Sequence, residues 1–355
     1  MAPSAIVAPA VTEQDVPIVT KGRPQPLASS GLLDQFEQFD VTPVIGTEFS
    51  SANLVELVVS QRGVVFFRAQ DDLTNDIQKV LVQRLGELTG KPITSGLHIH
   101  PVLNPSQEFG GTDPEISTIS SAQHKKRYSV APGEKLTAKP PSAEYWHSDI
   151  AFEPVPADYS SLRLIELPRT GGDTLWASGY ELYDRISEPY QKFLDGLTGT
   201  FAQPGLTAAA ARGDVKVYDK LRGAPENDGS SFKAVHPVVR TNPVTGWKSL
   251  FPVGDHIHHI NGVTEEESKS LLSWFLDLVY KNHDLQVRFQ WKNPNDIAIW
   301  DNRSTFHRAT FDYDGQGERF GNRAVGVGER PYFDPNSKSR REALREHAPG
   351  EKIQV

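Results

Sequence analysis

The sequence of 355 residues contains no cysteine. The chain can therefore form no disulfide, no zinc or iron–sulfur site with thiolate ligands, and no covalent intermediate on a thiolate. It also lacks any apolar run near the roughly 20 residues that a membrane-spanning helix needs. Its first residues lack the basic start and apolar core of a secretory signal. We therefore expect a cytoplasmic protein with no membrane partner.

Basic charge is scarce as well. The chain has 37 lysines and arginines against 45 aspartates and glutamates, which gives a net charge of -8 at pH 7. A protein that binds nucleic acid would need a basic face, so we expect no such partner. The 17 phenylalanines and a hydrophobic content of 37% are enough for a sizeable core, and the length fits one large domain or two ordinary ones.

Short β-like runs broken by proline and glycine make up most of the chain. We predict strands at 63–68, 161–167, 173–177, 232–239, 248–253, 286–291, 296–300 and 322–328. Two segments follow helical spacing instead: 74–88, and a segment that begins at Thr264, where Thr264 and Glu267 fit a capping box. Many short strands separated by turns indicate a mainly β fold, a sandwich or jelly roll, with helices on its flanks.

The chain contains no linker that divides it convincingly into two domains. We expect a single catalytic domain over 26–335, preceded by a flexible leader at 1–25 that is rich in alanine, proline, valine and threonine. The segment 203–230, rich in alanine, glycine, aspartate and lysine, is predicted to be an insertion or a lid. The charged residues 336–355 are predicted to form a surface tail or helix.

The most informative stretch holds His147 and Asp149, two residues apart. Alternate residues of an extended strand point to the same side, so the imidazole and the carboxylate can reach one point in space. Downstream, the motif Trp-Asp-Asn-Arg-Ser-Thr-Phe-His ends at His307 and offers a second imidazole. Two histidines and one carboxylate form the facial triad that binds Fe(II) and leaves coordination positions open for a cosubstrate and oxygen.

Two further features indicate a site for an anion. Thr174 opens a strand after a glycine pair and brings a hydroxyl that can donate a hydrogen bond. Arg323 shares one strand face with Val325, Val327 and Glu329, at a period of two. An arginine on the inward face of a small jelly roll needs an anion, because a buried unpaired guanidinium is costly. Its planar fork suits a carboxylate.

Two histidine-rich segments remain. Leu97-His98-Ile99-His100-Pro101 follows the first predicted helix, and its second histidine, His100, could line the mouth of a pocket. His256 and His258 share a strand face further along, but the pattern supplies no third ligand for a second metal. We therefore interpret the segment around His256 as a solvated loop or a loop at the pocket rim.

With these motifs in this order, the chain resembles the taurine dioxygenase (TauD/TfdA-like) family of Fe(II)/2-oxoglutarate-dependent dioxygenases. The resemblance runs from about Gly63 to Arg323 and rests on Gly-Val-Val-Phe-Phe-Arg, Leu-His-Ile-His-Pro, Trp-His-x-Asp, Gly-Gly-Asp-Thr-Leu-Trp and Trp-Asp-Asn-Arg-x-Thr-x-His. The ending Gly-Glu-Arg-Pro-Tyr-Phe is similar to fungal members. The resemblance implies a double-stranded β-helix, a cupin-like form of jelly roll.

The resemblance also implies roles for individual residues. The catalytic iron ligands would be His147, Asp149 and His307. Thr174 and Arg323 would bind the distal carboxylate of the cosubstrate 2-oxoglutarate, and O2 would be the oxidant. His100 matches a histidine that contacts the substrate in the sulfonate-using members.

The chain departs from the family pattern in two places. The loop between His307 and Arg323 is longer than in the bacterial taurine enzymes, so Arg319 is a rival for the carboxylate of 2-oxoglutarate. We favour Arg323, because a regular alternating strand follows it, whereas Arg319 sits in a glycine-bounded turn. Four residues after Arg323, where the taurine enzymes have an arginine that holds the sulfonate, this chain has Val327. We therefore expect a substrate less charged than taurine, and Glu329 could accept a hydrogen bond from an amine on it.

The expected activity is that of an Fe(II)- and 2-oxoglutarate-dependent dioxygenase. Such an oxidoreductase would hydroxylate a small organic molecule, sulfonate-like or other, and release succinate and CO2. Asp149 argues against halogenation, which needs a small residue at this place to leave room for chloride. Two alternatives stay open: a non-catalytic jelly-roll binding or sensor protein, and a zinc-dependent hydrolase that uses the same triad. The expected partners are the small-molecule substrate and, in a homo-oligomer, further copies of the chain.

Overall fold

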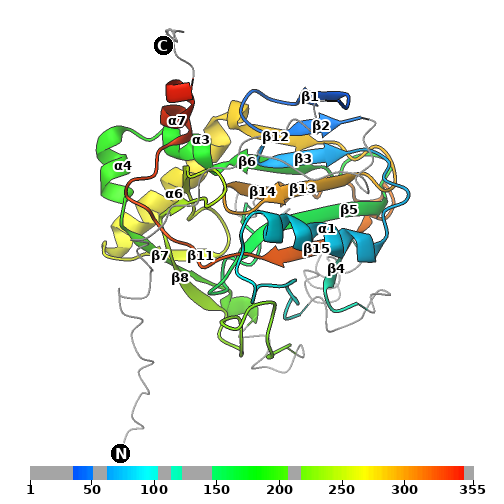
Figure 1. Ribbon diagram of the computed structural model, residues 1–355, viewed down its shortest axis with the longest axis horizontal. Helices are drawn as coiled ribbons and strands as arrows, with labels where there is room; N and C mark the ends of the chain where they lie inside the picture. Colours follow the sequence, from blue (N-terminus) through cyan, green and yellow to red (C-terminus); the bar gives the residue numbers. More distant parts are fainter. Residues whose placement is uncertain (1–34, 51–61, 103–112, 122–145, 207–216, 348–355) are drawn as a thin grey trace, which may run out of the picture.

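A computed structural model of the chain describes residues 35–50, 62–102, 113–121, 146–206 and 217–347. These residues form a mainly β structure with a few helices, and two sheets lie at its centre (Figure 1). The larger sheet has seven strands, in the order β1 (Gln38–Asp40), β2 (Thr47–Phe49), β3 (Val64–Phe67), β13 (Ile297–Asp301), β5 (Ala157–Glu166), β15 (Phe320–Val327) and β4 (Ile116–Ser120). The smaller sheet has three strands, in the order β12 (Gln286–Phe289), β6 (Thr174–Ser178) and β14 (Thr305–Ala309).

Strand β3 shows how alternation builds an apolar layer on each side of the larger sheet. Val64 and Phe66 pack against the smaller sheet, where Phe66 meets Trp176 edge-on with ring centroids 5.3 Å apart. Val65 and Phe67 belong to a second cluster, which includes the apolar side of helix α1 (Asn75–Leu88). Since both sides of the sheet are covered, all four residues of β3 are buried and the strand is a continuous apolar run.

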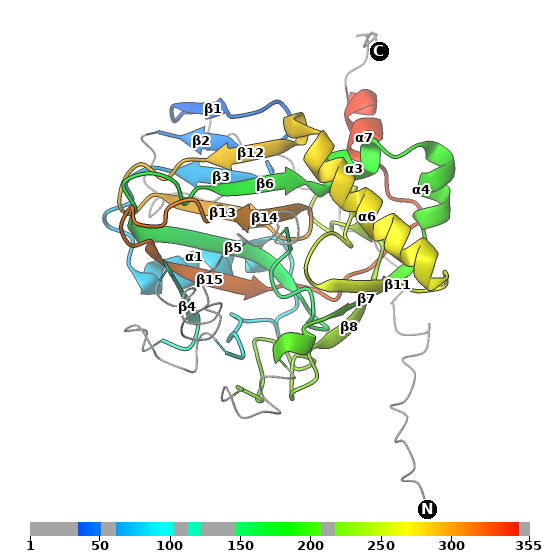
Figure 2. The same cartoon turned by 180° about the vertical axis from the view of Figure 1, so that it is seen from behind.

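Helix α1 crosses β5 and β15 on the side of the larger sheet that faces away from the smaller sheet (Figures 1 and 2). Thr74 begins the helix by accepting a hydrogen bond from the backbone N of Ile77. On the buried side, Nε2 of Gln78 donates to the hydroxyl of Ser161 and to the carbonyl of Asn322, each at 3.0 Å. These bonds fix the helix to both strands.

Helix α6 (Glu265–Lys281) lies at the other end of the molecule, beside the short helices (Figure 2). Thr264 and Glu267 form the predicted capping box. Leu271, Phe275 and Val279 make up the buried stripe, which packs into a large apolar cluster. The remaining elements are α3 (Gly179–Asp184), α4 (Glu188–Leu194), η4 (His283–Leu285), α7 (Arg340–His347), the sheet of β11 (Ile257–Ile260), β7 (Thr198–Ala202) and β8 (Lys233–Pro237), and the pair β9 (Val239–Thr241) and β10 (Lys248–Leu250).

The structure confirms both predicted helices and places a strand within each predicted run, often with shifted ends. It adds strands that the sequence did not predict, namely β1, β2, β4, β7, β9, β11 and β14. The predicted leader lies outside the described residues, and α7 accounts for part of the predicted tail. None of the helices described is long and apolar enough to cross a lipid bilayer.

Candidate functional site

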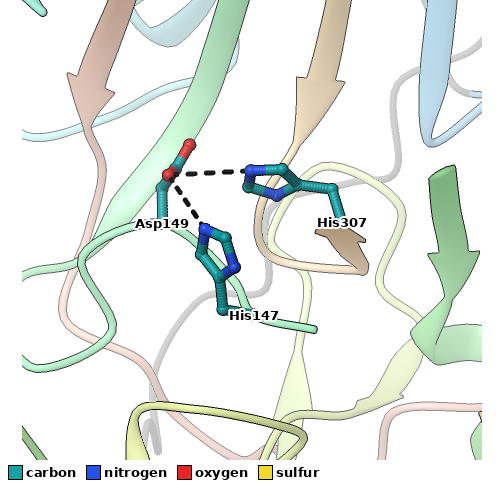
Figure 3. A group of neighbouring side chains, drawn as sticks. All are labelled: His147, Asp149 and His307. Carbon is teal, nitrogen blue, oxygen red and sulfur yellow. Dashed lines mark ion pairs between the residues drawn. The ribbon is translucent and has the colours of Figure 1, made fainter. Parts of the chain in front are cut away.

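The two candidate histidine ligands face each other on neighbouring antiparallel segments. His147 and His307 exchange both backbone hydrogen bonds, with N–O distances of 3.1 and 2.9 Å. Oδ1 of Asp149 lies 3.8 Å from Nε2 of His147 and 3.9 Å from Nε2 of His307 (Figure 3). One ligand atom from each residue lies within 4.8 Å of the other two. The three side chains predicted from the sequence therefore converge on one point.

Asn302 and Ser160 hold the carboxylate of Asp149 in place. Oδ1 of Asn302 accepts hydrogen bonds from the backbone N of Asp149 at 3.1 Å and from Nε1 of Trp300 at 2.9 Å. Nδ2 of Asn302 donates to the hydroxyl of Ser160 at 2.9 Å, and this hydroxyl donates to Oδ2 of Asp149 at 2.8 Å. The Trp-Asp-Asn-Arg motif, which precedes His307 in the sequence, thus also positions the carboxylate of Asp149. The spacing of the motif alone did not reveal this second role.

Burial and charge shift the pKa values of two members of the triad, Asp149 and His307. Burial alone would raise the pKa of Asp149, but Arg323, His307 and His147 outweigh it and hold this pKa well below its usual range. Burial is the main reason that the pKa of His307 lies well below its ordinary value. A carboxylate and a neutral imidazole are the forms in which these side chains bind metals. The triad therefore fits a divalent ion, and it is the one such convergent group in the described part of the chain.

A cavity of about 340 Å³ opens at the triad. Besides the triad, its polar lining includes four of the residues predicted from the sequence: His100, Thr174, Arg319 and Arg323. Its apolar lining consists of Ile119, Ile150, Phe152, Leu162, Leu206, Trp300, Ala309 and Phe311. A mostly apolar pocket with a few convergent polar groups is the usual form of a small-molecule site.

Arg319, and not Arg323, is the arginine that the structure brings to Thr174. Nη2 of Arg319 donates to Oγ1 of Thr174 at 3.3 Å, and Nε donates to the carbonyl of Gly172 at 2.8 Å. The Arg319 side chain is buried, and no carboxylate of the described residues forms an ion pair with it. A buried guanidinium without a counter-ion is costly. The pair of Arg319 and Thr174 is therefore suited to an anionic ligand.

The glycine-bounded turn that counted against Arg319 ends before this residue. Gly315 and Gly317 adopt the left-handed conformation, with φ of 73° and 113°. Arg319 already continues the pairing of β15 with the end of β4: its N donates to Oγ of Ser121 at 3.1 Å, and its carbonyl accepts from the N of Ser121 at 2.9 Å. Arg319 is therefore held as firmly as a strand residue, and its side chain reaches the same cavity as that of Arg323.

The residues predicted to share a face of β15 divide between the site and the core. Arg323 lines the cavity, and its Nη1 donates to Oδ1 of Asp149 at 2.7 Å. Val327 is fully buried and packs with Val325 in an apolar cluster. Glu329 accepts a hydrogen bond from Nη2 of Arg240 at 2.6 Å. Neither Val327 nor Glu329 is among the residues that line the cavity, so the lining gives no support to the prediction that they contact a substrate.

His100 lines the cavity next to a buried ion-pair network that the sequence did not reveal. Glu153 accepts a hydrogen bond from Nη2 of Arg222 at 2.8 Å and lies 3.2 Å from Nε2 of His98. The side chains of Glu153, Arg222 and His98 are all fully buried. The network joins part of the predicted insertion at 203–230 to the loop that follows Asp149, so this part of the insertion is fixed to the site.

The segment interpreted as a loop at the pocket rim contributes His256 to the cavity wall, beside Gln203. Burial, and then the neighbouring His147, lower the pKa of His256 to about 3, so its ring is neutral at pH 7. Sequence reasoning missed Gln203, the first residue of the predicted insertion, because no motif surrounds it. Only the pairing of β7 with β11 brings these two residues together.

The chain is similar to known proteins. The family model described as "Taurine catabolism dioxygenase TauD, TfdA family" matches residues 31–325. The alpha-ketoglutarate-dependent dioxygenase btcD of Neocamarosporium betae is 49% identical over 341 residues, which cover 90% of this chain and 98% of the relative. The alpha-ketoglutarate-dependent sulfonate dioxygenase of Saccharomyces cerevisiae is 30% identical over 305 residues, which cover 83% of this chain and 67% of the relative.

The fold has solved counterparts as well. A taurine dioxygenase from Burkholderia xenovorans matches the structure with a TM-score of 0.61 at 25% identity, over 85% of this chain and 92% of its own. The matched range, residues 31–325, spans the triad and the pair of Arg319 and Thr174. The chain belongs to the TauD/TfdA family of taurine catabolism dioxygenases.

Proposed function

We propose that this protein is an Fe(II)- and 2-oxoglutarate-dependent dioxygenase that hydroxylates a small organic anion and releases succinate and CO2. One observation carries the proposal: the convergent triad and the buried pair of Arg319 and Thr174 line the same cavity. A zinc hydrolase or a metal sensor would need the triad but would have no use for the pair. The relatives named alpha-ketoglutarate-dependent dioxygenases support this choice of cosubstrate.

His147, Asp149 and His307 would hold the iron. Two neutral imidazoles and a carboxylate are the donor set of non-haem Fe(II) oxygenases. Bound Fe(II) would supply the redox chemistry with 2-oxoglutarate and O2, which amino-acid side chains do not provide. The protein prepares the three donor atoms in advance. The two histidines are paired through their backbones, Asn302 accepts a hydrogen bond from the backbone N of Asp149, and Ser160 donates one to its carboxylate.

Arg319 and Thr174 would hold the distal carboxylate of 2-oxoglutarate. Oγ1 of Thr174 accepts hydrogen bonds from Arg319 at 3.3 Å and from Nε1 of Trp291 at 3.1 Å. A hydroxyl oxygen has two acceptor lone pairs, so both are used and the hydroxyl hydrogen remains to donate. The guanidinium and the hydroxyl together would then bind a carboxylate through charge-assisted, directional hydrogen bonds.

Arg323 would bind an anionic group of the primary substrate. With Arg319 on 2-oxoglutarate, Arg323 stands four residues further on, where the resemblance places the sulfonate-binding arginine of the taurine enzymes. The argument against taurine that was drawn from Val327 therefore no longer applies. Fe(II) would compete with Arg323 for Oδ1 of Asp149, which would leave the guanidinium to a substrate anion. The relative named a sulfonate dioxygenase supports a small sulfonate or a similar anion as the substrate.

The arrangement of the two sheets supports a finer description of the fold, a cupin-like jelly roll of the double-stranded β-helix type. His307 comes from β14 in the smaller sheet, and Ser160, which holds Asp149, comes from β5 in the larger sheet. The core between the sheets includes Phe66 and Trp176. In such a fold the metal site lies between two sheets that are both already packed.

The test of this function combines spectroscopy with product analysis. Without air, Fe(II) and 2-oxoglutarate should give the weak visible charge-transfer band of the metal–cosubstrate complex. With air and an alkyl sulfonate such as hexanesulfonate, the protein should release succinate. Activity with zinc in the absence of air would support a hydrolase instead, and a wild type that forms neither the band nor succinate would overturn the proposal.

A further inference from the structure

The wall of the cavity next to His147 carries a polar pair that the proposed chemistry does not use. Nε2 of Gln203 lies 2.7 Å from Nδ1 of His256, and both residues line the cavity. Gln203 directly follows β7 and His256 directly precedes β11, so the two residues come from the ends of different strands. The backbone N of Ala202 donates to the carbonyl of His256 at 2.8 Å, which holds the two segments in register.

The hydrogen bond from Gln203 determines which ring nitrogen of His256 carries the proton. An amide nitrogen can only donate, so Nδ1 of His256 must accept. In a neutral imidazole the proton then resides on Nε2. Among the residues that the structure describes, Nε2 of His256 has no hydrogen-bond partner. This atom is also absent from the set of fully buried side-chain atoms without a partner, so it is not enclosed by the protein. The pair therefore offers an accessible donor at the wall of the cavity.

Packing keeps this ring beside the metal ligands. The ring of His256 stands edge-on to that of His147, with ring centroids 5.5 Å apart. It also packs against the ring of Phe152, with ring centroids 5.2 Å apart. The preceding residue, Asp255, donates its backbone N to the carbonyl of Trp146 at 3.0 Å. A side chain on Gly254 would bring its Cβ to 1.5 Å from the same carbonyl, so only glycine allows this close approach.

We propose that His256 donates a hydrogen bond from Nε2 to an oxygen of the substrate's anionic group, and that Gln203 selects the tautomer that can do so. This inference rests on the proposed function and specifies how its substrate is recognised. Arg323, on the same cavity, supplies the charge that attracts the anion. The neutral, directional donor of His256 would orient the anion relative to the metal. A ring that served only for packing would be replaceable by phenylalanine without any loss of binding.

The test measures the binding of three six-carbon anions, namely hexanesulfonate, hexyl sulfate and hexanoate. Their dissociation constants come from the change in the visible band of the anaerobic Fe(II)/2-oxoglutarate complex, so the readout does not depend on turnover. His256→Phe keeps an aromatic ring but removes the donor, and it should weaken binding of the preferred anion roughly 10- to 100-fold. His256→Gln returns an N–H donor on a chain of similar reach and should restore most of the affinity. Gln203→Leu removes the hydrogen bond that fixes the tautomer of His256, so it should cause a smaller loss of affinity.

The exposed His258 provides the matched control, since His258→Phe makes the same substitution outside the cavity lining and should leave affinity unchanged. Equal affinity in wild type and His256→Phe would overturn the inference, as would a wild type that forms the band yet binds none of the three anions. If His256→Phe does not fold, His256→Leu takes its place, because it also has no donor and must bind the anion less tightly than His256→Gln. Absence of the band in wild type would be a failure of the proposed function and not of this inference alone.

Discussion

Nη1 of Arg323 donates a hydrogen bond at 2.7 Å to Oδ1 of Asp149, the same carboxylate oxygen that faces both imidazoles of the triad. The guanidinium therefore approaches the carboxylate on the side where a metal ion would bind. Arg319, four residues earlier, donates to Thr174 instead. Two arginines four residues apart thus border one cavity at different places, and their roles can be separated by experiment.

Arg319→Ala should raise the KM for 2-oxoglutarate roughly 10- to 1000-fold, because it removes a charge-assisted contact to the distal carboxylate. Arg323→Ala should leave that KM nearly unchanged and raise the KM for the anionic substrate instead. Steady-state succinate formation with either reactant varied would measure both constants. The reverse pattern, with the larger effect of Arg323→Ala on 2-oxoglutarate, would restore the assignment that the sequence favoured.

The hydroxyl of Ser160 should tune metal affinity through Asp149. Ser160→Ala removes the hydrogen bond of 2.8 Å to Oδ2, and loss of such a partner of a metal ligand weakens affinity roughly 10- to 100-fold. Anaerobic titration with Fe(II) would measure the change. Ser161→Ala is the control. The hydroxyl of Ser161 lies on the other side of β5, where it accepts a hydrogen bond from Gln78. Equal losses in both variants would indicate a general disturbance of β5 and not a specific effect on Asp149.

Local patterns explain which parts of this structure could be predicted. The spacing of His147 and Asp149 and the capping box at Thr264 involve neighbours in the sequence, so their geometry follows from a single strand or helix turn. The pairing of His147 with His307 needs a long-range contact, but the residue types make the chemistry recognisable even before the contact is known. The convergence of the three side chains and the capping box could therefore be predicted from the sequence.

The choice between Arg319 and Arg323 depends on contacts that local sequence patterns do not encode. Both residues follow the same turn, and the pattern after Arg323 is the more regular one. What favours Arg319 is its hydrogen bond to Thr174, together with the backbone contact that holds it to Ser121, a residue nearly two hundred positions earlier. No alternation of apolar residues encodes these contacts. The contacts of Gln203 with His256 and of Glu153 with Arg222 are likewise pairings between distant segments, so neither could be derived from spacing.

Glu153 and Arg222 should contribute to stability as a unit. Both side chains are fully buried, so Glu153→Gln would leave the charge of Arg222 without a counter-ion and should cost about 3–5 kcal/mol of unfolding free energy. Removing both charges in Glu153→Gln/Arg222→Met should recover part of that loss. Urea unfolding of the metal-free protein would measure all variants. Glu188→Gln is the control, since its ion pair with Lys192 is exposed and should matter little.

His236 should make the protein sensitive to mild acid. Its Nε2 lies 2.9 and 3.0 Å from the carbonyls of Ala151 and Glu153, so this nitrogen carries the proton of a neutral ring. Burial, and then Arg240, lower the pKa of His236 to about 3. Below its ordinary pKa of about 6.5, the unfolded chain therefore binds a proton that the folded chain does not. Stability then falls as the pH falls, by up to about 1.4 kcal/mol per pH unit between the two pKa values.

His236→Gln keeps a donor for these carbonyls but cannot be protonated, so it should remove this part of the pH dependence. The unfolding free energies of both proteins would be measured in urea with a chelator at pH 7, 6 and 5. The value for wild type should fall more steeply with falling pH than the value for the variant. This range stays above the region in which most carboxylates titrate. His98, whose pKa burial also lowers, remains in both proteins, so it adds equally to both slopes and cancels in the comparison. Parallel slopes for the two proteins would show that His236 is not the residue responsible.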